Sequence, residues 1–386
     1  MKRQRAPLGE LCNLVKGTSP ISKTLPGQYP LVTTGEERKT ADSFQLDTEA
    51  VCIPLISSTG HGHASLKRVH YQSGKFALAN LLVAALVKDD STLSLKFLTR
   101  YLNFTKDRLI VPLMTGAANM SISIDRLSTV PVEFPPLVEQ ERIVKLLDEG
   151  DELRKLRAQA NLRTAALIPS LFHEMFGPDA PGSATWQTAT VAELAAAHEG
   201  SIRTGPFGSD LRHSEFVEEG VPVLGIDNVV ENEFRWTKSR CIPEAKFAEM
   251  KRFIVFPADV LVTIMGTVGR CSVAPDDLPV CISTKHLCTV TLDRTKAHPR
   301  FIWGTFLHDA SVKQQTRSVG NGTIMEGWNS TIIKRLRLRV PPLALQKQFA
   351  TRVSEIRAVQ AEQSTSRRRL ENLFQSMLHR TFKGEL

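Results

Sequence analysis

Polar side chains recur on short loops of this chain that also contain glycine and other small residues. The set shares hydrogen-bond donors and acceptors, and its members are Ser58, His61, His63, Lys67, Arg68, Asn119, Arg203, Ser209, Asn228, Arg270, Lys285, His286, Arg317 and Asn321. Such side chains can bond to base edges in a DNA major groove, and small residues let the backbone approach phosphates. The alternative is that the loops are tight turns between strands. Any single one of these side chains could equally have a solvated surface role, but as a set on glycine-rich loops they favour contact with DNA.

Motifs for catalysis and metal binding are missing from the sequence. His61 and His63 lack further spaced ligands, so we predict no metal site. No GxxxxGK[ST] phosphate loop and no glycine-rich S-adenosylmethionine motif is present. The prolines after Phe134 lack the asparagine and the aromatic residue of amino-methyltransferases, and Glu244 and Lys246 lack a close Pro-Asp partner of a nuclease site. We therefore predict that the chain is not an enzyme and binds no cofactor.

Two long segments of the chain repeat each other. The segment from Pro135 aligns without a gap to the segment from Pro341, with Gln140 opposite Gln346. Each begins with Pro-Pro-Leu, which suits a helix start, and then spaces apolar residues by three and four as in a coiled coil. We predict two long helices, the first kinked near its end by Pro169. A repeat with so long a period indicates two copies of a half-molecule.

The apolar stripe of each predicted helix has a polar middle. This pattern leaves two interpretations open, weak packing with solvated flanks or a surface for a partner protein. The candidate partner-binding residues on the two helices are Gln140, Arg157, Asn161, Gln346, Gln360, Gln363 and Arg367.

The segments before each helix predict mixed α/β globules of one plan. In the first, residues 29–32 and 51–56 are typical of buried strands, residues 96–104 of a helix, and the apolar run 76–87 of a buried strand or helix. In the second, strands are predicted at 221–226 and 260–264 and a helix at 300–307. The predicted organisation is a globule at 1–134, a helix at 135–177, a linker at 178–182, a globule at 183–340 and a helix at 341–386. The globules share little sequence, which suggests a common backbone plan that carries two different recognition surfaces.

Composition narrows the class of protein further. The chain has 386 residues with a formal net charge of +9, a mild basicity that fits nucleic acid without establishing it. No stretch reaches the ~20 apolar residues of a membrane span, and the basic start lacks the apolar segment of a signal peptide. Six cysteines form no CxxC pair, which suits reduced thiols in a cytosol. We expect a cytoplasmic protein without membrane contacts.

These motifs together resemble the specificity subunit of type I restriction-modification systems. The shared features are Pro-Pro-Leu-x-x-Gln at each helix start, TGPFGS at 204–209, the glycine-rich segments near 116 and 320, and the repeat itself. The resemblance implies an α/β (α+β) fold with two target recognition domains, joined and separated by two antiparallel coiled-coil helices with pseudo-two-fold symmetry. It implies double-stranded DNA, two methyltransferase subunits and motor-nuclease subunits as partners. S-adenosylmethionine, ATP and Mg would then belong to those subunits.

Two alternatives stay open at this point. One is the specificity subunit of a type IIB-like restriction system, and the other is a scaffold whose globules bind protein rather than DNA. The sequence does not give the target bases, the spacer length or the stoichiometry of a complex, because loop side chains can reach several base edges and DNA shape adds further selectivity.

Overall fold

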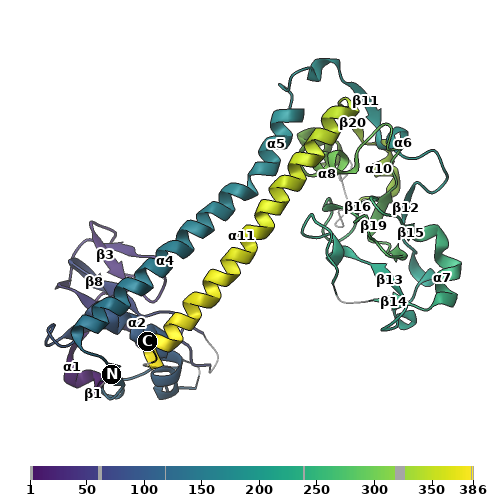
Figure 1. Cartoon of the computed structure of the whole chain (residues 1–386). Helices are drawn as coiled ribbons and strands as arrows, with labels where there is room; N and C mark the ends of the chain where they lie inside the picture. Colours follow the sequence, from purple (N-terminus) through teal and green to yellow (C-terminus); the bar gives the residue numbers. More distant parts are fainter. Residues whose placement is uncertain are drawn as a thin grey trace. The chain divides into compact units, whose positions relative to one another are not determined.

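The computed structural model describes residues 3–59, 63–117, 119–237, 240–317, 327–383 and 385, with the backbone only for Ser209 and Arg317. It divides into two compact units, residues 1–158 with 365–386 and residues 159–364. Each unit contains one mixed α/β globule, the beginning of one long helix and the end of the other (Figure 1).

The globule of the first unit consists of two four-stranded sheets and a short two-stranded one. Its elements, with η for 3-10 helices, are β1 (Gln4–Pro7), α1 (Leu8–Leu11), β2 (Cys12–Lys16), β3 (Tyr29–Val32), β4 (Lys39–Ala41), β5 (Leu46–Asp47), β6 (Ala50–Pro54), β7 (His70–Gln72), β8 (Lys75–Leu78), β9 (Leu82–Val87), α2 (Leu95–Leu109), η1 (Val111–Leu113), α3 (Ile124–Ser128) and β10 (Pro131–Phe134). The strand orders are β2-β9-β6-β7, β4-β3-β8-β5 and β1-β10. Of these pairs only β3 and β8 run parallel.

The globule of the second unit has the same topology. Its elements are η2 (Ser183–Thr185), β11 (Gln187–Thr190), α6 (Val191–Leu194), β12 (Ile202–Thr204), η3 (Gly208–Asp210), η4 (His213–Glu215), β13 (Val221–Leu224), η5 (Ile226–Asn228), β14 (Cys241–Ile242), α7 (Glu244–Met250), η6 (Lys251–Phe253), β15 (Ile254–Val255), β16 (Val260–Thr263), β17 (Cys271–Val273), β18 (Cys281–Ser283), β19 (Leu287–Val290), α8 (Pro299–His308), α9 (Ala310–Arg317), α10 (Ser330–Arg335) and β20 (Arg337–Val340). The orders β12-β19-β16-β17, β14-β13-β18-β15 and β11-β20 repeat those of the first unit strand for strand. The parallel pair is again the equivalent one, β13 with β18.

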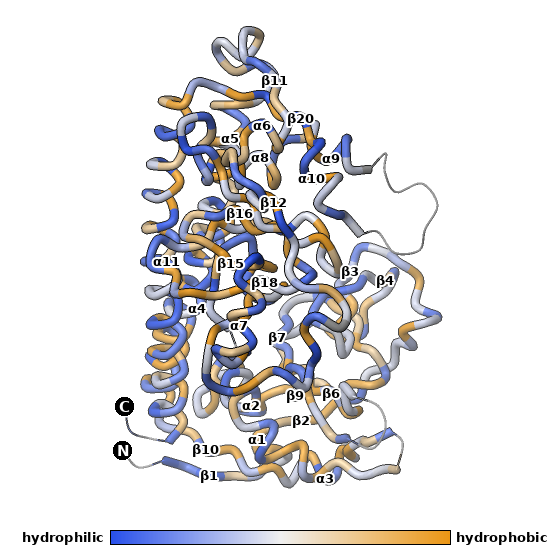
Figure 2. The backbone as a smooth tube through the Cα atoms, turned by 90° about the vertical axis from the view of Figure 1, so that its right-hand side faces the viewer, coloured by the Kyte–Doolittle hydropathy of each residue, from blue (hydrophilic) through white to orange (hydrophobic). Residues whose placement is uncertain are grey.

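The long helices follow the prediction, including the kink. They are α4 (Leu137–Ala165), α5 (Leu167–Phe176) and α11 (Leu343–Lys383). The break falls at Ala166 because Pro169 has no N–H for the carbonyl of Ala165, four residues earlier, and its ring crowds that carbonyl. Hydrophobic and hydrophilic residues alternate along α4 and α11 at short intervals, so neither helix is apolar throughout (Figure 2).

Polar pairs show that the helices run antiparallel. Arg154 contacts Glu371 at 2.9 Å in the first unit, and Thr164 donates to Gln363 at 2.8 Å in the second. Residue numbers therefore rise along α4 as they fall along α11. Gly150 allows close packing of the pair, since a Cβ there would lie 2.8 Å from the Phe374 ring. The predicted fold class, two globules of one plan with two long antiparallel helices, is confirmed.

Aromatic residues at the helix ends complete the two cores. Phe382 of α11 packs on Phe97 and Phe104 of the first unit, with ring centroids 5.8 and 5.1 Å apart. Phe176 of α5, its counterpart in the repeat, packs on Phe301 and Phe349 of the second unit at 5.0 and 5.2 Å. Burial of such rings stabilises each globule on its helices by roughly 1.5–3 kcal/mol per side chain.

The glutamine repeated in both helix starts joins each helix to its globule. Gln140 accepts from the N–H of Ser94, the N-cap of α2, at 2.9 Å and donates to Pro135 O at 2.8 Å. Gln346 accepts from the N–H of His298, the N-cap of α8, at 2.8 Å and donates to the equivalent proline carbonyl at 2.8 Å. Both side chains are completely buried. The repeated motif therefore fixes the angle between a long helix and the helix of the globule beside it.

Candidate nucleic-acid interface

Two loops predicted from the sequence lie side by side in the first unit. The loop after β6 pairs with the loop around 115–121, because Ser57 N–H donates to Met120 O at 2.8 Å and Ile122 N–H donates to Leu55 O at 2.9 Å. Thr115 and Ser121 then close the second loop through two backbone hydrogen bonds. The first loop leaves the end of β6, and the second, which joins η1 to α3, bonds to it there, so the fold gathers polar residues that are about sixty positions apart.

Hydroxyl groups shape the loop after β6. Ser57 Oγ donates to His63 O at 2.8 Å and accepts from Ser65 N–H at 3.0 Å, and Thr59 Oγ1 donates to the same His63 carbonyl. Ser58 Oγ accepts from Lys67 N–H at 2.9 Å. These bonds hold the backbone in a compact turn. The predicted residues that stay exposed on these loops are Ser58, His63, Lys67, Arg68 and Asn119, whereas His61 lies outside the described residues.

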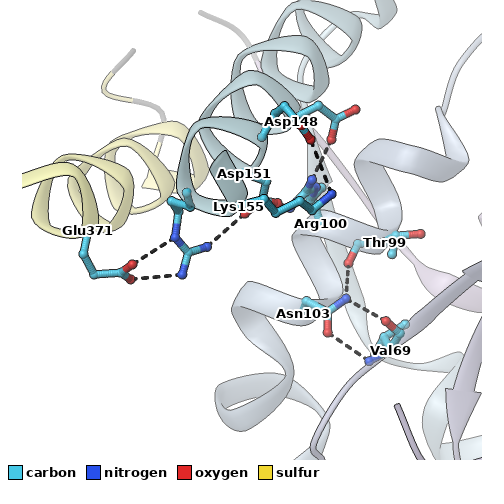
Figure 3. A network of polar contacts seen from close by, with 10 residues as sticks. Val69, Thr99, Arg100, Asn103, Asp148, Asp151, Lys155 and Glu371 are labelled. Carbon is cyan, nitrogen blue, oxygen red and sulfur yellow. Dashed lines mark hydrogen bonds and ion pairs between the residues drawn. The ribbon is translucent and has the colours of Figure 1, made fainter. Parts of the chain in front are cut away.

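The end of this loop is attached to the long helices through α2. Asn103 of α2 bonds both backbone groups of Val69, accepting from its N–H at 2.9 Å and donating to its carbonyl at 2.8 Å. One helical turn away, Arg100 contacts Asp148 and Asp151 of α4 (Figure 3). Asp151 also holds Arg154, which in turn binds Glu371 of α11. The loop after β6 is thus bound to α2, and ion pairs join α2 to α4 and α4 to α11.

Three segments of the second unit gather in the equivalent place. Ile264 N–H donates to His286 O at 2.9 Å, and Trp328 N–H donates to Ile264 O at 2.8 Å. The TGPFGS stretch joins them at Gly205, where a Cβ would lie only 2.1 Å from Ser283 O. Only glycine permits this approach. Both units therefore place loops of different sequence at the same end of the same sheet.

Cationic side chains concentrate near His286 in the second unit. Arg270 is exposed, and Lys285 and His286 are half-buried. Burial, followed by the charges of Lys285 and Arg240, lowers the pKa of His286 below its usual range. Its imidazole is therefore neutral at pH 7 and offers one hydrogen-bond donor and one acceptor. This combination suits contact with a base edge beside a phosphate backbone.

The sequence does not predict Arg240, whose charge acts on His286, or the exposed Trp236. Arg240 contacts Asp227, and its half-exposed guanidinium contributes to the positive charge around His286. Trp236 is 52% exposed and packs edge-on against Phe234 at 5.2 Å between centroids. A usable signal was the sequence Phe-Arg-Trp in a segment without helical or strand periodicity.

Two predicted residues instead have structural positions. Arg203 is buried and pairs with buried Asp259 at 2.6 Å, while Thr291 Oγ1 accepts a further bond from its guanidinium. Asn228 is buried, accepts from Gly225 N–H at 2.8 Å and donates to Arg235 O. These side chains are engaged inside the globule, so we remove them from the proposed DNA contacts. Asn321 and the side chains of Ser209 and Arg317 lie outside the described residues.

The polar middle of the helices also differs from the expected partner surface. Thr164 bonds Gln363, and Gln360 donates to Thr164 O at 2.9 Å, so these groups pair across the two helices. Arg157 donates to Ser366 at 3.0 Å, and Asn161 is half-buried. Gln140 and Gln346 are buried, which corrects their assignment as partner contacts. Of the residues predicted to bind a partner, Arg367 is the exposed one.

The remaining reactive side chains are structural. All six cysteines are buried. Burial raises the pKa of the Cys12, Cys52, Cys281 and Cys288 thiols to about 12, so they stay protonated at pH 7. Within the described ranges, no three His, Cys, Asp or Glu residues lie close enough to hold a metal ion. In the same ranges, no helix combines the length and the apolar character needed to cross a membrane.

Comparison with known proteins connects this architecture to one family. Residues 4–162 match the sequence model of a family described as "Type I restriction modification DNA specificity domain". The type I restriction enzyme MjaVIII specificity subunit of Methanocaldococcus jannaschii is 20% identical over 376 residues, covering 90% of this chain and 84% of that protein. The S subunit of a type I restriction-modification system from M. genitalium has a TM-score of 0.60 at 16% identity, with 99% and 96% of the two chains covered. A chain from a structure of type I R-M system assembly has a TM-score of 0.61 at 16% identity, with 100% and 98% covered.

Proposed function

We propose that this chain, which belongs to the specificity subunits of type I restriction-modification systems as its sequence predicted, selects the DNA site of such a system in the cytoplasm. The observation that supports this most is the repeated topology of the two units, which present different side chains on equivalent loops. A common frame with two sets of side chains is what the reading of two different half-sites requires. Each globule reads one half of a bipartite, asymmetric site.

The exposed loop residues make two kinds of contact with DNA, one with phosphates and one with base edges. Lys67 and Arg68 in the first unit and Arg270 and Lys285 in the second attract phosphates, and Arg can also bind guanine bidentately. Asn119 offers the amide pattern that pairs with adenine. Phosphate contacts supply affinity that falls with salt, whereas base contacts supply the sequence preference. This chain contributes recognition, and the chemistry belongs to its partners.

Two methyltransferase subunits and motor-nuclease subunits complete the proposed complex. Support for docking on the helices comes from apolar side chains on α4 that are exposed, with Leu153 54% and Leu156 52% accessible. Exposed leucines in a row are typical of interaction surfaces. S-adenosylmethionine would bind the methyltransferases, and ATP and Mg the motor subunits.

Reconstitution tests this function. The purified chain alone is expected to transfer no methyl group from S-adenosylmethionine, whereas the chain with its methyltransferase subunit methylates adenine within one bipartite motif. The measurement is tritium transfer to a plasmid carrying the motif, with a plasmid lacking one half-site as control. Methylation by the chain alone would contradict the proposal, as would a complex that methylates both plasmids equally.

The helices are proposed to set the spacing of the half-sites. Four extra residues in a helix add about 6 Å of rise and turn the remainder of the helix by about 40° beyond one full turn. That rise is close to two base pairs at about 3.4 Å each. The hydrogen bonds Thr164–Gln363 and Arg157–Ser366 lie on opposite sides of the point between Gln363 and Ser364. An insertion there in α11 alone would prevent both bonds from forming together. The variant therefore also carries a matched insertion after Ala158 of α4.

The matched insertion is expected to keep both half-sites and lengthen the non-specific spacer by about two base pairs, at reduced activity. Mapping of methylated adenines in cells that express the variant measures this. The single insertion in α11 serves as the control for disturbed pairing of the helices. Altered half-site bases with an unchanged spacer would contradict the role of the helices, because the loops of both globules are intact.

A further inference from the structure

The second unit has a cavity at the end of its sheet opposite the interface loops. Its volume is about 640 Å³. Ala258 precedes β16 and Ala274 follows β17, whereas the 264–270 loop joins the other ends of these two antiparallel strands. The remaining walls come from the start of α8 and the first turns of α11. We call this space the basic cavity, because its charged residues are Arg294, Arg300 and Lys347 with the single carboxylate Asp276.

The cations of the basic cavity are not neutralised inside the unit. Arg294 and Lys347 form no ion pair with any carboxylate in the described part of the chain. Arg300 contacts Glu233 at 3.3 Å, but that carboxylate also binds Arg357 at 2.8 Å. His298 accepts from Arg300 N–H through Nδ1, which leaves its Nε2 proton for another acceptor. The cavity therefore presents excess positive charge and hydrogen-bond donors.

Comparison of the two halves of the repeat shows that two of the three cations are specific to the second unit. Asp293 and Asp89 cap the same turn, each accepting from the N–H two residues later at 3.0 Å. The next residue is Arg294 in the second unit and Asp90 in the first. Lys347 on α11 corresponds to Glu141 on α4 through the helix repeat. The positions equivalent to Arg294 and Lys347 are thus carboxylates in the first unit, whereas Arg300 corresponds to another cation, Lys96.

We propose that the basic cavity binds an acidic segment of a partner protein that assembles with this chain, an inference that rests on the proposed function. A peptide fits better than DNA for two reasons. The cavity lies at the far end of the sheet from the interface loops, and apolar Val273, Pro275 and Ala350 line it between the cations. A peptide with carboxylates and apolar side chains matches such a lining, whereas a phosphate backbone offers no apolar groups.

The reversed charges give this proposal a consequence for assembly. Two identical partner subunits would meet a basic cavity on the second unit, whereas the equivalent place on the first unit has the carboxylates Asp90 and Glu141 beside the cation Lys96. The acidic segment therefore engages one copy of the partner only. The two docking positions differ in affinity and in their dependence on salt, since the charged contact is screened at high ionic strength.

A photo-cross-linker placed at Thr351, an exposed residue that lines the basic cavity, tests the proposal in the complex of the full chain with its methyltransferase subunit. Mass spectrometry of the cross-linked peptides is expected to find a segment of the methyltransferase rich in Asp and Glu. The double variant Arg294→Asp, Lys347→Glu installs the charges of the first unit. It is expected to abolish this cross-link and to lower affinity for the methyltransferase about tenfold.

Arg352→Glu is the matched control, because Arg352 is exposed on the same helix and does not line the cavity. It is expected to keep both the cross-link and the affinity. A cross-link to DNA, a cross-linked segment without acidic residues, or equal affinities of the double variant and the control would overturn the proposal. A wild-type chain that binds no methyltransferase would overturn the proposed function as well, so the two failures are distinguishable.

Discussion

Replacement of residues 183–340 by the equivalent globule of another specificity subunit is expected to change one half of the target site and leave the other half intact. The globule has its own sheets, and its core closes on Phe176 of α5 and Phe349 of α11. Its interface loops bond to one another within the unit. The side chains that read DNA are therefore exchanged as a set, while the loops of the first unit keep their support from Asn103 and Arg100.

The reciprocal exchange of residues 1–134 is the control for this experiment. It is expected to alter the other half-site only, and the two motifs together define which globule reads which half. The readout is the methylated motif of cells that express each chimera with the same methyltransferase. A chimera in which both half-sites change together would contradict independent reading by the two globules.

Arg203→Ala is expected to lower the free energy of unfolding of the second unit by about 3–5 kcal/mol. The substitution leaves the carboxylate of Asp259, which is 1% exposed, without its cation in the interior. All four tryptophans of the chain, Trp186, Trp236, Trp303 and Trp328, lie in the second unit. Urea unfolding followed by tryptophan fluorescence therefore reports this unit directly.

Two controls separate a structural role of Arg203 from a role in recognition. Arg203→Met with Asp259→Asn removes both charges and is expected to recover part of the loss, because a neutral pair is less costly to bury. The exposed Arg270→Ala is expected to change stability by less than about 0.5 kcal/mol while weakening DNA binding. A stable Arg203→Ala protein with altered half-site bases would show that Arg203 reads DNA.

The sequence predicts the architecture well because the repeat and its proline starts are local signals. Pro135 and Pro341 mark the helices, and Pro169 marks the kink to within a few residues. The apolar run 76–87 is ambiguous between strand and helix when only the sequence is known. The structure makes it two strands, β8 and β9, since the segment around Asn80 turns between them.

The candidate site is harder to predict because exposure is decided by tertiary packing. Arg203 and Arg270 both border glycine-rich loops, but only Arg203 meets a buried carboxylate, Asp259, which lies 56 residues away. Gln140 is noticeable in the sequence because its position is repeated in the second helix. The residues next to it in the sequence do not indicate that it binds the N-cap residue of α2. Trp236 is easily overlooked because exposed aromatic residues resemble core residues in a sequence.

This chain is proposed to choose a bipartite DNA site. Mapping of methylated adenines across the genome of cells with and without the gene for this chain, in the presence of its methyltransferase, tests that claim most directly. The expected result is one asymmetric motif of two specific halves separated by a fixed non-specific spacer, methylated only when the chain is present. Identical methylation in both strains, or a single continuous motif, would contradict it.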